Sequence, residues 1–226
     1  MTLQIAIDGP AASGKSTDAK LLAERINGLY VNTGLMYRAI AGAAYNFHID
    51  PEKNPQELVK LLPQWTLEYR LDNENKKLEL FFNDKPVDNA FLRSKEVSDV
   101  VSQVAAIPEV RDWMLQKQRD CAKLPIIIME GRDIQTVVLP NATYKFFITA
   151  SPEERARRRL KQGDFKDGTT LKEVAEQIKL RDHLDSTRAV APLKPAADSL
   201  VINTDNMTPD EVVDKMVEHM QKNPRS

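Results

Sequence analysis

The chain has 226 residues, enough for one sizeable core with smaller appended lobes. Its 32 Lys and Arg nearly balance its 33 Asp and Glu, so no overall basic excess indicates a nucleic-acid partner. No apolar run approaches the roughly 20 residues that cross a bilayer, and the N-terminus lacks the basic start of a secretory signal. A single cysteine, Cys121, excludes an internal disulfide, and we expect it to be buried and inert. These features predict a cytoplasmic protein.

The first 63 residues predict alternating strands and helices. Short apolar strands are expected at 3–7 and 28–32, and a helix with apolar residues at helical spacing at 16–26. Thr33 is the expected N-cap of a helix that continues to Phe47. A further helix is predicted at 50–63, because proline and acidic residues suit a first helical turn.

The pattern changes at Trp65, where apolar and polar residues alternate in three short segments separated by turn residues. This predicts a small antiparallel meander, inserted into an otherwise alternating β/α chain. Its aromatic residues are interpreted as the core of this lobe rather than as a base-stacking platform: Trp65, Tyr69, Phe81 and Phe82. Helices are expected to follow at 94–107 and 108–123.

The rest of the chain returns to the β/α pattern. Residues 126–130, 144–149 and 199–203 are strands, and the first two lack a polar face, as buried parallel strands do. Helices are predicted at 152–162, 171–185 and 208–220, with a loop at 162–170. Five strands separated by helices predict a parallel sheet covered on both faces.

The segment "GPAASGKS" has the full pattern of a phosphate-binding loop, and it lies in the required place between a strand and a helix. Its glycines let the backbone curl so that amide hydrogens point at phosphate oxygens, and the helix N-terminus adds partial positive charge. Lys15 can reach the β- and γ-phosphates, and the Ser16 hydroxyl can ligate Mg²⁺ carried by ATP. The segment therefore predicts a nucleoside-triphosphate site.

Arginines lie beside many of the predicted loops and helix ends. Phosphoryl transfer between two nucleotides brings two clusters of negative charge together, and guanidiniums screen their repulsion. Any one of these arginines, taken singly, is more often a solvated surface residue than a functional one. The set favours a small-molecule kinase: Arg38, Arg111, the run at 155–159, Arg181 and Arg188.

At the end of the strand at 126–130 the apolar run stops at the charged segment "EGRD". Ligands of open parallel sheets bind beyond the carboxyl ends of the strands, which is where Arg132 and Asp133 are expected to project. The alternative is that these two residues pair with each other as a structural cap of the strand.

Several segments together resemble the bacterial cytidylate kinases, a group of nucleoside-monophosphate kinases: "AIDGPAASGKST", "NTGLMYRA", "SQVAAIPEVR", "EGRDIQTVVLP" and "RDHLDSTRAVAPL". The resemblance runs nearly end to end. It implies an α/β P-loop kinase fold with a five-stranded parallel sheet in a single domain, 1–226. Within that domain it implies an inserted acceptor-binding lobe at 34–93 and a mobile lid with flanking helices at 153–190.

The resemblance also implies the reaction, in-line transfer of the γ-phosphoryl group of MgATP to CMP and to dCMP by a monomer, without nucleic-acid or membrane partners. ATP would be bound by the phosphate loop and by arginines of the lid: Gly9, Pro10, Ala11, Ala12, Ser13, Gly14, Lys15, Ser16, Thr17, Arg155, Arg158 and Arg159. CMP would be bound by Thr33, Arg38, Ser102, Arg111, Arg132, Asp133, Arg181, Asp185 and Arg188. The implied catalytic residues are Lys15, Arg132, Arg158 and Arg181. Closure of the acceptor lobe and the lid would exclude water.

Two positions depart from the usual pattern of that family. Asn32 stands where members usually have Asp, and Gln135 stands where they usually have Gly. Asn32 keeps a hydrogen-bonding side chain but loses a charge. Gln135 replaces a residue that can adopt positive φ with one that does so at a cost.

Alternative functions remain open at this point. A kinase for UMP or for a non-nucleotide alcohol would share the phosphate loop, although arginines aimed at an acceptor phosphate favour a nucleotide. A guanine-nucleotide switch would be expected to carry an "NKxD" element, which the chain lacks. His48, His183 and His219 lack metal-ligand spacing and are interpreted as surface or packing residues.

Overall fold

The computed structural model describes residues 2–161 and 168–224. The chain divides into two compact units, one formed by residues 1–30 with 125–226 and the other by residues 31–124. The loop predicted at 162–170 falls mostly outside the described residues.

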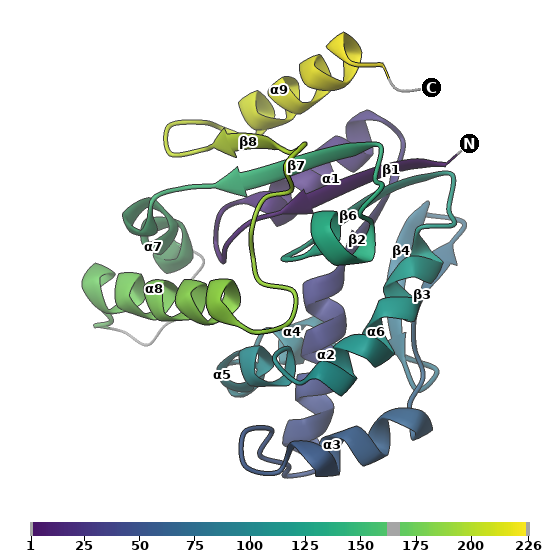
Figure 1. Ribbon diagram of the computed structural model, residues 1–226, viewed down its shortest axis with the longest axis vertical. Coiled ribbons are helices and arrows are strands. Elements are labelled where there is room, and N and C mark those ends of the chain that lie inside the picture. Colours follow the sequence, from purple (N-terminus) through teal and green to yellow (C-terminus); the bar gives the residue numbers. More distant parts are fainter. Residues whose placement is uncertain (1, 162–167, 225–226) are drawn as a thin grey trace. The chain divides into compact units, whose positions relative to one another are not determined.

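The first unit is built on a five-stranded sheet with strand order β2-β6-β1-β7-β8 (Figure 1). The strands are β1 (Leu3–Asp8), β2 (Leu29–Asn32), β6 (Ile126–Gly131), β7 (Tyr144–Thr149) and β8 (Leu200–Asn203). β1 pairs in parallel with β6 and with β7, and β7 pairs in parallel with β8. All five strands lie where they were predicted, and the carboxyl ends of β1 and β6 meet in register at Asp8 and Gly131.

One face of this sheet carries the helices α1 (Lys15–Arg25) and α9 (Pro209–Lys222). Alternate strand residues such as Ile5, Ile7 and Phe146 point into this layer and are fully buried, as the period of two in a strand requires. His219 of α9 packs edge-on against the Tyr144 and Phe146 rings, so its predicted packing role is confirmed. The helices α7 (Pro152–Lys161) and α8 (Leu171–Thr187) pack together around a smaller apolar cluster.

The second unit surrounds the helix α2 (Thr33–Asn46), which is buried on nearly every side (Figure 1). Its short residues allow close packing, and a Cβ added at Gly42 would lie 2.9 Å from a ring carbon of Phe91. The other elements are α3 (Pro55–Leu61), a 3₁₀ turn (Leu62–Gln64), β3 (Leu67–Asp72), β4 (Lys77–Phe82), β5 (Lys85–Pro86), α4 (Asn89–Leu92), α5 (Lys95–Val104) and α6 (Pro108–Cys121). The antiparallel order β3-β4-β5 confirms the predicted meander.

Three local predictions in this unit were wrong. The N-cap of α2 is Asn32, whose side-chain oxygen accepts a hydrogen bond from the Leu35 amide at 3.1 Å, so Thr33 is the first helical residue. The third helix begins only at Pro55, because Asp50 instead accepts the amides of Glu52 and Lys53 in a turn. Phe81 does not join the core of the lobe.

The position of Phe81 follows from the alternation of β4. Leu80 and Phe82 face the core with Trp65, whereas Phe81 faces the other side of the sheet and lies under the Arg70 guanidinium, 4.4 Å from the ring centre. The prediction for Cys121 is confirmed, since it is buried on α6 and burial raises the pKa of its thiol to about 11. No helix among the described residues is both long enough and apolar enough to span a membrane.

Candidate active site

The phosphate loop, residues 9–16, connects β1 to α1 and has the curled backbone that its sequence predicts. A Cβ at Gly9 would lie 2.0 Å from the Ile148 carbonyl oxygen, so only glycine fits beside β7. Ala12 and Gly14 have φ of 59° and 97°, in the left-handed region. Alternating left-handed and right-handed residues turn successive amides to one side, which produces an anion-binding concavity.

Lys15 is the central cation of this loop. It is 6% exposed, and its ammonium donates to the Pro10 carbonyl oxygen at 2.9 Å. Burial, followed by the positive charges of Arg132 and Arg181, lowers the pKa of Lys15 to about 7, while Glu130 and Asp185 oppose the change. Burial and the neighbouring arginines both disfavour the charged ammonium, and the negative charge of bound phosphates would offset both effects. Such a site attracts a polyanion.

Arg132 and Asp133, the residues after β6 that are predicted to bind the acceptor nucleotide, lie near the phosphate loop in the same unit. The Arg132 Nε donates to the Asp185 carboxylate at 3.0 Å, and an Arg188 nitrogen lies 3.9 Å from an Asp133 oxygen. Burial by itself would raise the pKa of Asp185, but Arg132, Arg181 and Arg188 outweigh burial and lower it. Arg132 and Asp133 therefore each have an ion-pair partner on the segment 185–188 instead of pairing with each other as a cap.

Glu130 is a residue of this site that the sequence analysis did not assign. It is 3% exposed, and one carboxylate oxygen accepts hydrogen bonds from the Ser16 hydroxyl at 2.5 Å and from the Tyr30 hydroxyl at 2.6 Å. The signal in the sequence was a carboxylate at the end of a buried strand, two residues before Arg132. Its partners lie about 100 positions away, which no local pattern indicates.

The arginines of α7 contact the phosphate loop from its outer side. When the amides of a loop point inward, its carbonyl groups point outward and need donors. Arg155 is buried and donates to the Ala11 and Ala150 carbonyls, and it forms an ion pair with Asp182 at 2.6 Å. Arg158 donates to the Ser13 carbonyl at 3.1 Å and to the hydroxyl and carbonyl of Thr204 at 2.9 and 2.6 Å.

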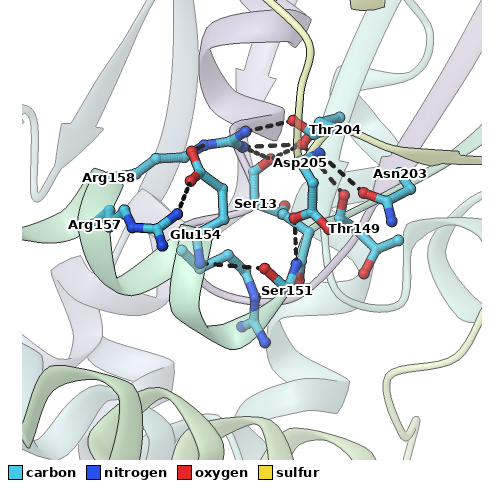
Figure 2. A network of polar contacts seen from close by, with 11 residues as sticks. Ser13, Thr149, Ser151, Glu154, Arg157, Arg158, Asn203, Thr204 and Asp205 are labelled. Atoms are coloured by element: carbon cyan, nitrogen blue, oxygen red, sulfur yellow. Dashed lines mark hydrogen bonds and ion pairs between the residues drawn. The ribbon is translucent and has the colours of Figure 1, made fainter. Parts of the chain in front are cut away.

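Figure 2 shows the resulting network, in which Arg158 lies between Glu154, Ser13 and Thr204. The same network fixes the start of α7, because Asp205 accepts the Ser151 amide at 2.6 Å. Arg157, one residue away, is exposed and its guanidinium donates to Glu154. Arg159 is half-buried on the same helix.

We expect Arg158→Ala to raise the KM for ATP about tenfold and to lower the melting temperature by several degrees, because the Ser13 and Thr204 carbonyls lose charged donors. Arg157→Ala is the matched control, since it removes an exposed guanidinium from the same helix. Steady-state kinetics and calorimetry on both variants check this. Equal behaviour of the two variants would contradict the structural role of Arg158.

The remaining predicted acceptor residues lie in the second unit. The Arg38 guanidinium donates to the Leu92 carbonyl at 2.7 Å and to the Ser98 hydroxyl at 2.9 Å. Arg111 is buried, donates to the Ala105 carbonyl at 3.0 Å and lies over the Tyr37 ring. Thr33 is buried in the first turn of α2, and Ser102 is half-buried on α5.

The expectation for Gln135 was wrong. Gln135 is not among the positive-φ residues of the described chain, and it lies in a short π-helical turn, Ile134–Val138. Its buried amide donates to the Phe146 carbonyl at 2.6 Å and accepts the Ala196 amide at 3.2 Å. The side chain therefore joins β7 to the segment before β8, and no backbone cost arises at this position.

Comparison with known proteins agrees with this geometry. The family model described as cytidylate kinase matches residues 5–222. A cytidylate kinase of Limosilactobacillus reuteri (strain DSM 20016) is 44% identical over 224 residues, covering 97% of this chain and 96% of that protein. A cytidylate kinase of Shouchella clausii (strain KSM-K16) is 45% identical over 222 residues, covering 98% and 97%. A solved shikimate kinase from Bacteroides thetaiotaomicron has a TM-score of 0.51 at 13% identity, covering 97% of this chain and 98% of that one, and this likeness shows the fold alone.

Proposed function

Because the chain belongs to the cytidylate kinase family, we propose that it transfers the γ-phosphoryl group of ATP directly to the phosphate of CMP or dCMP, giving ADP and the nucleoside diphosphate. The observation that supports this best is the convergence of charge in the first unit. Lys15 lies among Arg132, Arg181, Glu130 and Asp185, so one set of groups can act on the transferring phosphoryl and on the acceptor phosphate.

The residues of this chain divide the work of in-line transfer. The phosphate loop and Lys15 hold the β- and γ-phosphates, and Arg132 and Arg181 stabilise the charge shared between donor and acceptor. Asp185, held by Arg132, can accept hydrogen bonds from the ribose hydroxyls, and Asp133 can accept from the cytosine amino group. Arg158 is proposed to bind a phosphate through the guanidinium that donates to the Ser13 carbonyl and to Thr204.

The remaining assignments rest on the family resemblance. Thr33, Arg38, Ser102 and Arg111 are proposed contacts of CMP, with Arg38 on its phosphate. Arg188 is proposed to lie near the base and phosphate, and Arg155 and Arg159 are proposed to serve ATP. We also propose a monomer in the cytoplasm, an acceptor lobe at 34–93 and a lid at 153–190.

The donor atoms near the loop fit Mg²⁺ brought by ATP. Mg²⁺ prefers oxygen ligands and binds through one or two protein groups, several waters and substrate phosphates. The Ser16 hydroxyl and the Glu130 carboxylate, 2.5 Å apart, are such a pair. Ser16 would ligate the ion and Glu130 would accept from its water, and the bound ion would neutralise charge on the phosphates.

We expect Glu130→Gln to raise the Mg²⁺ concentration needed for half-maximal activity about tenfold, because groups that orient metal ligands change affinity by that order. Magnesium titrations at fixed ATP check this. Glu153→Gln, at an exposed position of α7, is the control. An unchanged magnesium requirement in Glu130→Gln would remove Glu130 from the metal site.

The test of the proposed function is ADP formation from MgATP with CMP, dCMP, UMP and AMP offered separately. We expect fast turnover with CMP and dCMP and slow turnover with the other two. Equal turnover with all four would overturn the base-reading roles of Ser102, Arg111 and Asp133. If folded protein that binds ATP forms no ADP with any of the four nucleotides, the proposed function is overturned.

A further inference from the structure

Asp8, the last residue of the central strand β1, has no role in the assignments above. It directly precedes Gly9, the first residue of the phosphate loop, and it is fully buried. One carboxylate oxygen accepts the Ile134 amide at 3.0 Å, and the other accepts the Gln135 amide at 2.8 Å. Both partners lie about 126 positions further along the chain.

These two amides begin the π-helical turn that follows Arg132 and Asp133. The first amides of a helical turn have no partner within the turn, so a cap must supply an acceptor. Asp133 occupies the cap position, but its side chain makes no capping hydrogen bond. The start of the turn is therefore fixed by Asp8, from another strand.

The turn is also anchored at a second point. The Gln135 side chain bonds to the Phe146 carbonyl and the Ala196 amide. Asp8 and Gln135 together hold the turn against β1 and β7. The backbone that carries Arg132 and Asp133 consequently has little freedom, although both side chains serve a ligand.

The carboxyl group is costly at this place. Burial is the main cause that raises the pKa of Asp8 to about 7; the nearby Asp133 acts in the same direction, while the two amides and Arg132 oppose the change. A carboxylate offers an acceptor on each oxygen, whereas the isosteric amide of Asn would direct a donor at one of the two backbone amides. A carboxylate supplies both of the acceptors that these two amides use.

We propose that Asp8 is a positioning residue for the acceptor nucleotide, which fixes the turn that carries Arg132 and Asp133 and joins it to the start of the phosphate loop. This inference rests on the proposed function for its kinetic consequence. Its structural part, the fixed turn, stands on the two hydrogen bonds.

The test compares Asp8→Asn with Asp72→Asn, steady-state kinetics being measured for both substrates. Asp72 is the matched control, because its carboxylate also accepts two backbone amides, those of Glu74 and Asn75. Losing a charged hydrogen bond on the turn should raise the KM for CMP between about tenfold and a hundredfold in Asp8→Asn and leave the KM for ATP within about twofold. Asp72→Asn should change neither constant.

Unchanged constants in Asp8→Asn, or an equal rise in both KM values, would overturn the assignment.

A second measurement needs no variant and covers the case in which Asp8→Asn does not fold. In the wild-type protein we expect the Ile134 and Gln135 amides to exchange with solvent at least about a hundredfold more slowly than unprotected amides. Exchange at the unprotected rate would overturn the proposal, even if wild-type turnover of CMP confirms the proposed function. Slow exchange without CMP turnover would instead identify the proposed function as the part that fails.

Discussion

Lys15→Met is expected to lower kcat about a thousandfold while leaving the melting temperature unchanged or higher. The loss follows from removing the cation that lies at the centre of the phosphate loop, where charge develops during transfer. The unchanged stability follows from burial, because Lys15 is 6% exposed and its charged form is disfavoured there. Methionine has a similar length and carries no charge that must be desolvated.

Single-turnover kinetics and calorimetry on the same preparation separate the two effects. A variant that retains more than about a tenth of the wild-type kcat would remove Lys15 from the mechanism. A variant that loses activity together with a large part of its stability would show that Lys15 is mainly structural, which contradicts our assignment.

Arg132→Ala is expected to lower kcat/KM for CMP by about a hundredfold to a thousandfold. Arg132 forms the 3.0 Å ion pair with Asp185, and both side chains are largely buried. Its removal takes away a proposed phosphate ligand and also leaves the Asp185 carboxylate without its nearest cation. Arg132 also lowers the pKa of Lys15 by its charge, so its removal favours the charged form of Lys15 in the phosphate loop. We therefore expect the KM for ATP to change much less than the KM for CMP.

Arg157→Ala again provides the control, as an exposed arginine of the same unit. An equal loss of kcat/KM for CMP and for ATP would show that Arg132 serves the phosphate loop in general rather than the binding of CMP. Kinetics at fixed saturating ATP and varied CMP, then the reverse, distinguish these outcomes.

Strands and the phosphate loop could be predicted because their signals are local. The apolar run at 126–130 and the segment "GPAASGKS" each have one structural interpretation in context. Helix starts were harder to predict than strands, because neighbouring polar side chains compete for the same backbone amides. At α2 the Asn32 side chain captures the Leu35 amide, and at 50–54 the Asp50 side chain forms its own turn before a helix can begin.

Contacts between distant segments could not be predicted from the sequence. The hydrogen bonds of Glu130 to Ser16 and of Asp8 to the turn at 134 depend on β1 and β6 being neighbours in a specific register. Gln135 illustrates the same limit, since its identity is explained by the Phe146 carbonyl and the Ala196 amide, which lie 11 and 61 positions away. The family resemblance predicted which residues serve the ligands, but it could not predict which residues hold those in place.

The measurement that tests the central claim most directly follows the transferred group itself. ATP labelled with heavy oxygen in its γ-phosphoryl group is mixed with CMP, Mg²⁺ and the protein, and the products are identified by mass spectrometry. We predict that the label appears in the terminal phosphate of CDP as ADP accumulates. Label found in inorganic phosphate, with CMP unchanged, would contradict the account and leave only an ATP-hydrolysing protein.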